Sequence, residues 1–117
     1  MRVCVVWLCA TFLLPQSVQA QSTDEPAWLL YERGVRAMEQ RDLGTAFSYI
    51  RQSIALRGVF PEAEMMLAEI YSREGETALA IRHFERALDN EALFQIPERR
   101  YEALYRLADM YDDISEP

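Results

Sequence analysis

The chain has 117 residues, half of them apolar and 26% charged, which is enough for one small domain with a hydrophobic core. Its formal net charge is −7 at pH 7. An acidic chain repels phosphate backbones, so we do not expect nucleic acid as a partner. Both cysteines, Cys4 and Cys9, lie near the N-terminus, and the rest of the chain has no thiol for a disulfide, a nucleophile or a metal ligand.

The N-terminal segment 1–20 has the pattern of a secretory signal peptide. Arg2 provides a positive charge, residues 3–14 form an apolar run, and Val18-Gln19-Ala20 places small residues where a signal peptidase cuts. The apolar run is shorter than the roughly 20 residues that span a bilayer. We expect cleavage after Ala20, a periplasmic or secreted protein, and no stable membrane span after signal removal. An uncleaved anchor is one alternative; a lipoprotein signal is another, although large residues precede Cys9.

A short polar lead over 21–26 precedes the first predicted helix. Pro26 suits the first position of a helix, and this helix should continue to about residue 41. Asp42-Leu43-Gly44 then turns the chain, and a second helix should run to about residue 57. Gly58 favours its end, because glycine adopts the left-handed conformation of a helix C-terminus.

The clearest pattern lies between residues 66 and 88. Leu67 and Tyr71 are four positions apart, and so are Ala80 and Phe84, so each pair lies on one face of a helix. Gly75 falls between the pairs, where a turn must reverse the chain. The pattern predicts two antiparallel helices, from Pro61 to about residue 74 and from Glu76 to about residue 90.

The same spacing occurs in a weaker form in the preceding segment, at positions lower by 34. Members of the first unit correspond in order to members of the second: Gly34, Ala37, Ala46, Ile50, Ser53 and Ile54 to Ala68, Tyr71, Ala80, Phe84, Ala87 and Leu88. A helix-turn-helix unit of about 34 residues is the signature of tetratricopeptide repeats. From about Ala27 onward the chain therefore resembles the tetratricopeptide repeat (TPR) family. The first unit departs from the pattern, with Leu30 at the Trp position, Arg33 at the Leu position and Arg41 at the turn Gly.

The period then lengthens from 34 to 40 positions, which is the separation of Leu107-Ala108 from Leu67-Ala68. Since proline begins helices more readily than it interrupts them, we expect a loop over 91–96 and a fifth helix over 97–113. The expected fold is all-α: a TPR-like solenoid of two hairpins, repeats 27–60 and 61–94, plus this helix. The fifth helix is either a terminal cap or the start of a third repeat in a longer protein. Oligomerisation is also possible, since repeats bury their apolar sides against neighbours.

The resemblance to TPR proteins implies a concave groove lined by the first helix of each repeat. Carried over by position, the groove residues are Trp28, Tyr31, Val35, Met38, Met65, Glu69, Tyr105 and Asp109. Aromatic and Met side chains suit a groove for a peptide or helix. For Tyr31 and Met38, a place in the core is an equal alternative. Groove positions of this composition do not suit the Lys- and Asn-based carboxylate clamp of some TPR domains.

No pattern for catalysis stands out. His83, the single histidine, has no serine or carboxylate at a triad spacing, and we expect a surface or partly packed helix residue. Calcium-loop and phosphate-loop patterns are absent from the sequence. We therefore expect no enzyme, metal or cofactor, but an exported adaptor or scaffold, in a bacterial envelope or periplasmic assembly, that binds a protein or peptide partner. The alternatives are a self-associating module and the N-terminal part of a larger TPR protein.

Overall fold

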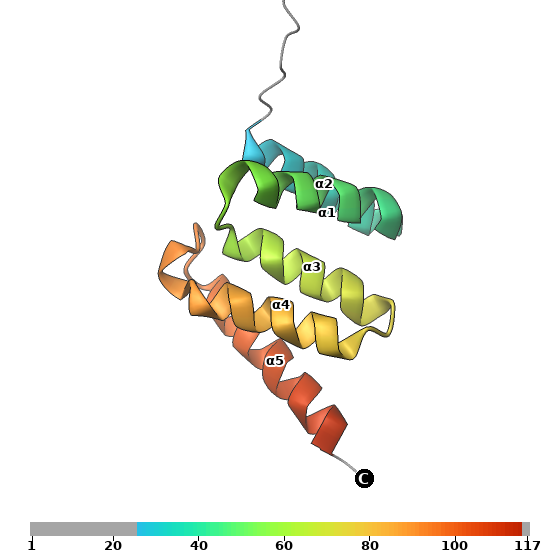
Figure 1. The fold of residues 1–117 in the computed structure, drawn as a ribbon, viewed down its shortest axis with the longest axis vertical. Coiled ribbons are helices and arrows are strands. Elements are labelled where there is room, and N and C mark those ends of the chain that lie inside the picture. The colour runs from blue at the N-terminus through green and yellow to red at the C-terminus, as the bar shows by residue number, and fades with distance from the viewer. Residues whose placement is uncertain (1–25, 116–117) are drawn as a thin grey trace, which may run out of the picture.

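The computed structural model describes residues 26–115, which contain helices and turns but no strand. The elements are α1 (Ala27–Glu39), α2 (Leu43–Arg57), α3 (Pro61–Arg73), α4 (Thr77–Asp89), the short 3₁₀ turn η1 (Glu91–Leu93) and α5 (Arg99–Ser115). The predicted all-α architecture of two hairpins plus a fifth helix is confirmed (Figure 1). The predicted signal peptide, its cleavage after Ala20 and nearly all of the polar lead lie outside the described residues.

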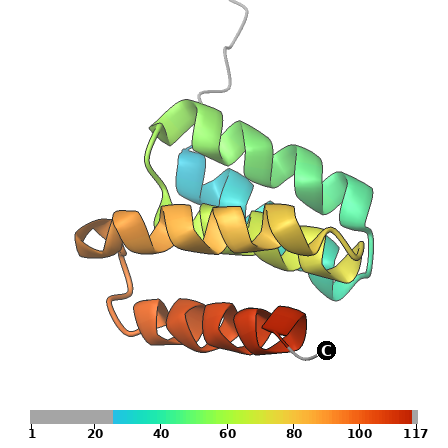
Figure 2. The ribbon, with the colours of Figure 1, turned by 60° about the horizontal axis from the view of Figure 1, so that its bottom comes forward.

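The helices follow one another along a stack. α1 packs against α2 and α3 against α4 as hairpins, while α2 contacts α3 and α4 contacts α5. The first hairpin lies at one end of the stack and α5 at the other (Figure 1). In the turned view, α5 forms a separate layer beside the second hairpin, and no other described helix covers its outer side (Figure 2). The α3–α4 hairpin is therefore the part with neighbours on both sides.

Local sequence explains where the helices begin and end. The Asp42 carboxylate accepts a hydrogen bond from the Thr45 backbone N–H at 3.1 Å, so α2 begins at Leu43, inside the expected turn. Gly75 follows α3 with φ of 80°, a conformation open to glycine. Arg41, the equivalent position in the first hairpin, adopts the same left-handed region with φ of 61°. The first hairpin thus keeps the turn of the second without its glycine, at a cost of about 1–2 kcal/mol.

Small residues let the paired helices approach closely. Ala46, Ala68 and Ala80 are fully buried where the helices cross. At Gly34, a Cβ atom would lie 2.5 Å from Cδ1 of Ile50, so a larger residue there would force the buried Ile50 side chain to move. Phe84 fills the space beside the second crossing and is 2% exposed, and burial of such a side chain contributes about 1.5–3 kcal/mol.

α5 packs on the second hairpin in the register that the sequence pattern predicts. Its buried side contains Ala103, with Leu107 and Met110 packed on the same core cluster. These three side chains lie 40 positions after Ala63, Leu67 and Ile70, through which α3 packs on the first hairpin. The extra segment forms η1 and the turn after it, and α5 begins at Arg99 rather than at Pro97.

A buried carboxylate holds the connection into α5. Glu62 on α3 is 0% exposed, and one carboxylate oxygen accepts hydrogen bonds from the backbone N–H groups of Gln95 and Ile96, the latter at 3.1 Å. Charge-assisted bonds of this kind are stronger than those between neutral groups. Glu62 therefore fixes the segment that leads from η1 to α5.

Candidate functional site

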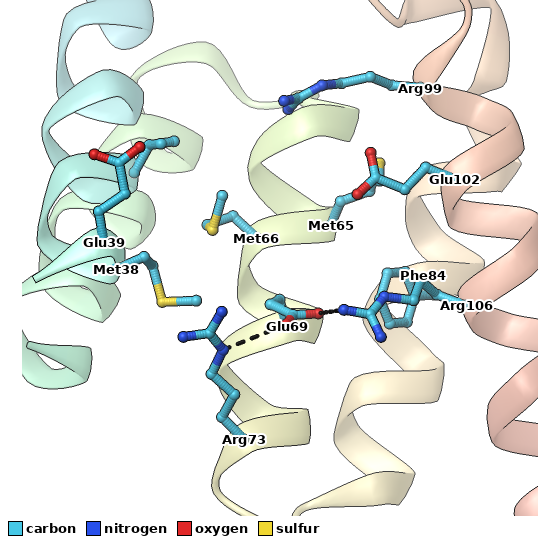
Figure 3. Close-up of a pocket in the computed structure, with 11 residues that line it drawn as sticks. Met38, Glu39, Met65, Met66, Glu69, Arg73, Phe84, Arg99, Glu102 and Arg106 are labelled. Atoms are coloured by element: carbon cyan, nitrogen blue, oxygen red, sulfur yellow. Dashed lines mark hydrogen bonds and ion pairs between the residues drawn. The ribbon is translucent and has the colours of Figure 1, made fainter. Parts of the chain in front are cut away.

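A concave face crosses α1, α3 and α5 and contains a cavity of about 330 Å³ (Figure 3). We call this cavity the groove. The residues that line it are Val35, Met38, Glu39, Met65, Met66, Glu69, Arg73, Phe84, Arg99, Glu102 and Arg106. All except Phe84, from α4, come from the odd-numbered helices, because those helices face the same side of the stack.

The floor of the groove is apolar. Met65 and Met66 lie near its centre, Met38 lies toward α1, and Phe84 lies toward α5 beside Arg106 (Figure 3). Met38 and Met65 are only 6% and 7% exposed, so they serve the core and present an edge to the groove at the same time. Met38 is therefore both a core residue and a groove residue. Unbranched Met side chains adapt their shape to different apolar partners.

Charged side chains surround this floor. The Glu69 carboxylate lies 3.3 Å from Nε of Arg73 and 2.9 Å from a terminal guanidinium nitrogen of Arg106 (Figure 3). The bond to Arg106 joins α3 to α5. Both arginines stay about half exposed, so they remain accessible to a ligand. The rim as a whole carries three glutamates and three arginines.

Trp28 and Tyr31 lie beside the groove, at the α1 end. They line an adjoining cavity that shares Val35, Glu39 and Arg99 with the groove. The two aromatic rings lie 5.1 Å apart, and Tyr31 is buried in the core. The Tyr31 hydroxyl accepts a hydrogen bond from Arg99. Burial raises the pKa of Tyr31, and the positive charge of Arg99 offsets part of that rise.

Asp109 extends the concave face in the other direction. It lines a second adjoining cavity of about 380 Å³, which shares Glu69, Phe84 and Arg106 with the groove. Of the eight residues predicted for the groove, Val35, Met38, Met65 and Glu69 line it and Trp28, Tyr31 and Asp109 border it.

Tyr105 lies apart from the other residues predicted for the groove. It lines none of these cavities and is 72% exposed on the outer side of α5. The side of α5 that faces the groove carries Glu102 and Arg106 instead. Met65, the equivalent of Tyr105 on α3, enters the groove because α5 packs beside it. No described helix takes that place beside α5.

Sequence reasoning missed the arginines of the rim. The pairs Glu69/Arg73 and Glu102/Arg106 have the helical i, i+4 spacing, and this spacing indicates support for a helix. In the structure Arg73 does pair with Glu69, but Arg106 also pairs with Glu69 rather than with Glu102. The groove is consequently less acidic than its predicted positions implied.

His83 takes part in a buried polar cluster on α3 and α4. It is 8% exposed, its Nδ1 lies 2.7 Å from the Glu64 carboxylate, and its ring stacks on Tyr71 at 5.3 Å. Arg86 lies 3.8 Å from the same carboxylate. The expected surface or partly packed histidine is thus a buried one with a defined partner. None of the residues of this cluster lines the groove.

Two features are absent from residues 26–115. Within this range, no helix is both long and apolar enough to cross a membrane. Within the same range, no group of three or more His, Cys, Asp or Glu side chains is arranged to hold a metal ion.

The chain is similar to a protein of Treponema pallidum (strain Nichols) that is described as uncharacterized. The two sequences are 31% identical over 71 residues. The match covers 61% of this chain and 18% of the relative, so the chain spans less than a fifth of that protein's length. No family model matches the chain, and no solved structure does.

Proposed function

We propose that the protein is an exported, non-enzymatic adaptor of the TPR type that binds a segment of another protein in the groove. The observation that carries the proposal is the groove's composition: an apolar floor of Met and Phe side chains inside a rim of opposite charges. An amphipathic helix or peptide matches such a surface, because its apolar side chains cover the floor while its polar ones meet the rim. The repetition of the helix pattern at about 34 residues supports the TPR assignment.

The chemistry of the groove limits the partner. A segment with a free or side-chain carboxylate would compete with Glu69 for Arg73 and Arg106, whose guanidinium groups Glu69 already holds. A segment that has apolar anchors and charges of both signs can replace these ion pairs with its own pairs to Glu69 and to the arginines, so that no charge is left unpaired. We therefore expect a partner with two or more large apolar residues on one side and mixed charges beside them.

Site-specific photo-crosslinking tests the proposal. A photoreactive side chain is placed in the groove at Val35 or Glu102, and for comparison on exposed positions of α2 and α4, at Gln52 or Arg82. Crosslinks to one defined segment from both groove positions and from neither control are expected. Equal crosslinking from all four positions would contradict the groove as the binding surface.

The identified segment then permits a quantitative test. We expect Val35→Glu to weaken its binding about tenfold or more, since a carboxylate would enter the apolar contact. Gln52→Glu adds the same charge on an exposed position of α2 and should leave the affinity unchanged. Unchanged binding by Val35→Glu would reject the proposed site.

Export is tested separately, by mass spectrometry of the protein isolated from the producing cells. A mature N-terminus at Gln21 is the expected result. Retention of residues 1–20 would contradict cleavage after Ala20 without bearing on the groove.

A further inference from the structure

The outer side of α5 presents an apolar stripe to solvent. Tyr101, Leu104 and Tyr105 are 60%, 48% and 72% exposed, and Ala108 is exposed beside them. We call these four residues the α5 stripe. Their spacing places them on one face of the helix. The side chains 40 positions earlier on α3 are all buried by packing: Pro61, Glu64, Met65 and Ala68. The α5 stripe is therefore exposed at the positions that packing buries in α3. It also contains more large apolar side chains than those positions of α3.

The charges of α5 also differ from those of the other helices. α1, α2, α3 and α4 each have an arginine in the last turn, where a positive charge favours the negative end of the helix dipole: Arg36, Arg57, Arg73 and Arg86. α5 has no basic residue there and ends with Asp112 and Asp113. At its start, Arg99 and Arg100 lie beside the acidic residues Glu98 and Glu102. The carboxylates at the C-terminal end of α5 thus oppose its own dipole. An antiparallel helix with the same charges would place an opposite charge at both ends.

We propose that α5 is a homodimer interface, in which α5 of a second copy packs antiparallel on the α5 stripe. Each half of the resulting two-fold interface uses the same residues. With the two-fold axis at the level of Arg106, Leu104 of one copy faces Ala108 of the other, and Arg100 of one copy faces Asp112 of the other. The apolar contact and the charge contact therefore form in one register.

Arg100 is already directed toward the stripe. Its guanidinium group lies 4.9 Å from the centre of the Tyr101 ring and donates a hydrogen bond to the Tyr101 hydroxyl at 2.9 Å. Asp112 follows Ala108 by one helical turn, so it continues the line of the stripe. The charges lie at the edge of the apolar surface, where an interface rim is usually polar.

The interface is small. α5 has 17 residues, which corresponds to a length of about 26 Å. A contact of one helix per copy lies below about 1,200 Å² of buried surface, the range of weak or transient complexes. We expect dissociation in the micromolar range. The two-fold axis is perpendicular to the plane of the paired helices. Glu102 and Arg106 lie about a third and about two fifths of a turn, respectively, from the centre of the stripe. The two grooves consequently open on the same side of the dimer.

Sedimentation velocity over a concentration series of the purified protein tests this proposal. The expected result is a monomer at low micromolar concentration and a dimer at several hundred micromolar. Leu104→Glu should abolish the dimer at all these concentrations. Circular dichroism of each variant shows whether the helices are intact, and the exposure of Leu104 makes loss of folding an unexpected outcome.

Charge reversal distinguishes the proposed register from other contacts. Arg100→Glu and Asp112→Arg should each weaken the dimer about tenfold, because every substitution acts at both ends of a symmetric interface. The double variant should restore the dissociation constant to within about threefold of wild type. Arg82→Glu, an exposed reversal on α4, is the matched control and should have no effect.

Three results would overturn the proposal. One is a wild-type protein that stays monomeric throughout the series, in which case another chain or no chain covers the stripe. Another is a dimer that survives Leu104→Glu, which would place self-association on a different surface. The third is a double charge variant weaker than either single one, which would exclude the antiparallel pairing of Arg100 with Asp112.

Discussion

α3 and α5 carry the same Leu-Ala-x-x-Tyr motif at the same helical positions, yet among the described helices α3 has neighbours on both sides and α5 on one. Met65 on α3 is 7% exposed, whereas its equivalent Tyr105 on α5 is 72% exposed. One position earlier, the usual relation of polarity to burial is reversed. The charged Glu64 of α3 is buried beside His83, and the apolar Leu104 of α5 is exposed. The motif therefore specifies how a helix packs on the repeat before it. Whether the other side of the helix is core or surface depends on the presence of a further helix beside it.

The largest expected difference between the two helices is at Met65 and Tyr105. Met65→Asp would bury a charge in the cluster of Ala68, Phe84 and Ala103, and should lower the free energy of unfolding by about 3 kcal/mol or more. Tyr105→Asp should change it by less than about 0.5 kcal/mol. Urea denaturation at low micromolar protein concentration measures both, and similar losses would show that α5 has a covering partner under these conditions.

A second pair of variants gives each helix the residue that the other has at the equivalent position, Glu64→Leu on α3 and Leu104→Glu on α5. Glu64→Leu would leave the buried His83 without its carboxylate, and should cost about 1–3 kcal/mol of stability. The double variant Glu64→Leu, His83→Leu should recover part of that loss, since no unpaired polar group remains. Leu104→Glu should be neutral within about 0.5 kcal/mol. Urea denaturation of the monomer measures all three. Equal stability of Glu64→Leu and of the double variant would show that an unpaired, buried His83 does not lower the stability.

The groove rim offers a smaller contrast. Glu69→Gln removes the ion pairs with Arg73 and Arg106 and should cost about 0.5–1 kcal/mol, because both arginines are half exposed. Asp109→Asn, at the equivalent position of α5, should cost less than about 0.3 kcal/mol. Thermal unfolding at low and at high salt measures the difference, which should shrink as salt screens the pairs. A salt-independent difference would point to packing instead.

The smallest effect concerns Tyr31, which connects α1 to Arg99 of α5. Burial raises its folded-state pKa above the ordinary value of about 10, so the neutral phenol contributes stability that is fully present below about pH 10. That contribution is lost as pH rises through the folded-state pKa. Tyr31→Phe should therefore flatten the alkaline fall in stability, measured by urea denaturation between about pH 8 and 11. An unchanged alkaline fall would contradict it, and Tyr105→Phe controls for the loss of an exposed hydroxyl.

Much of the fold is predictable from short-range sequence patterns. The four-position spacing within Leu67 and Tyr71 and within Ala80 and Phe84 indicates helix faces, and Gly75 marks the turn, so the hairpins and their order can be predicted. The register of α5 can be predicted from Leu107 for the same reason. The position of Tyr105 could not be obtained in this way, because it depends on whether a helix packs beside α5.

The polar contacts were not predictable because they join distant residues. Glu64 and His83 are 19 residues apart on different helices, and nothing local marks them as a pair. Arg106 has a suitable partner four positions earlier in Glu102, but in the folded chain it pairs with Glu69, 37 residues away. Ion-pair choice among exposed side chains rests on small free-energy differences, and only the packing of α3 beside α5 decides it.

Glu62 has a consequence for the evolution of such stacks. Because a carboxylate from α3 holds the backbone N–H groups of Gln95 and Ile96, the approach to the fifth helix is fixed by a bond and not by the length of the connection before it. The connection can then gain or lose several residues while the next helix still packs at the same position on the hairpin. Repeat arrays with such an anchor can tolerate insertions between repeats that would otherwise shift the packing of one repeat on the next.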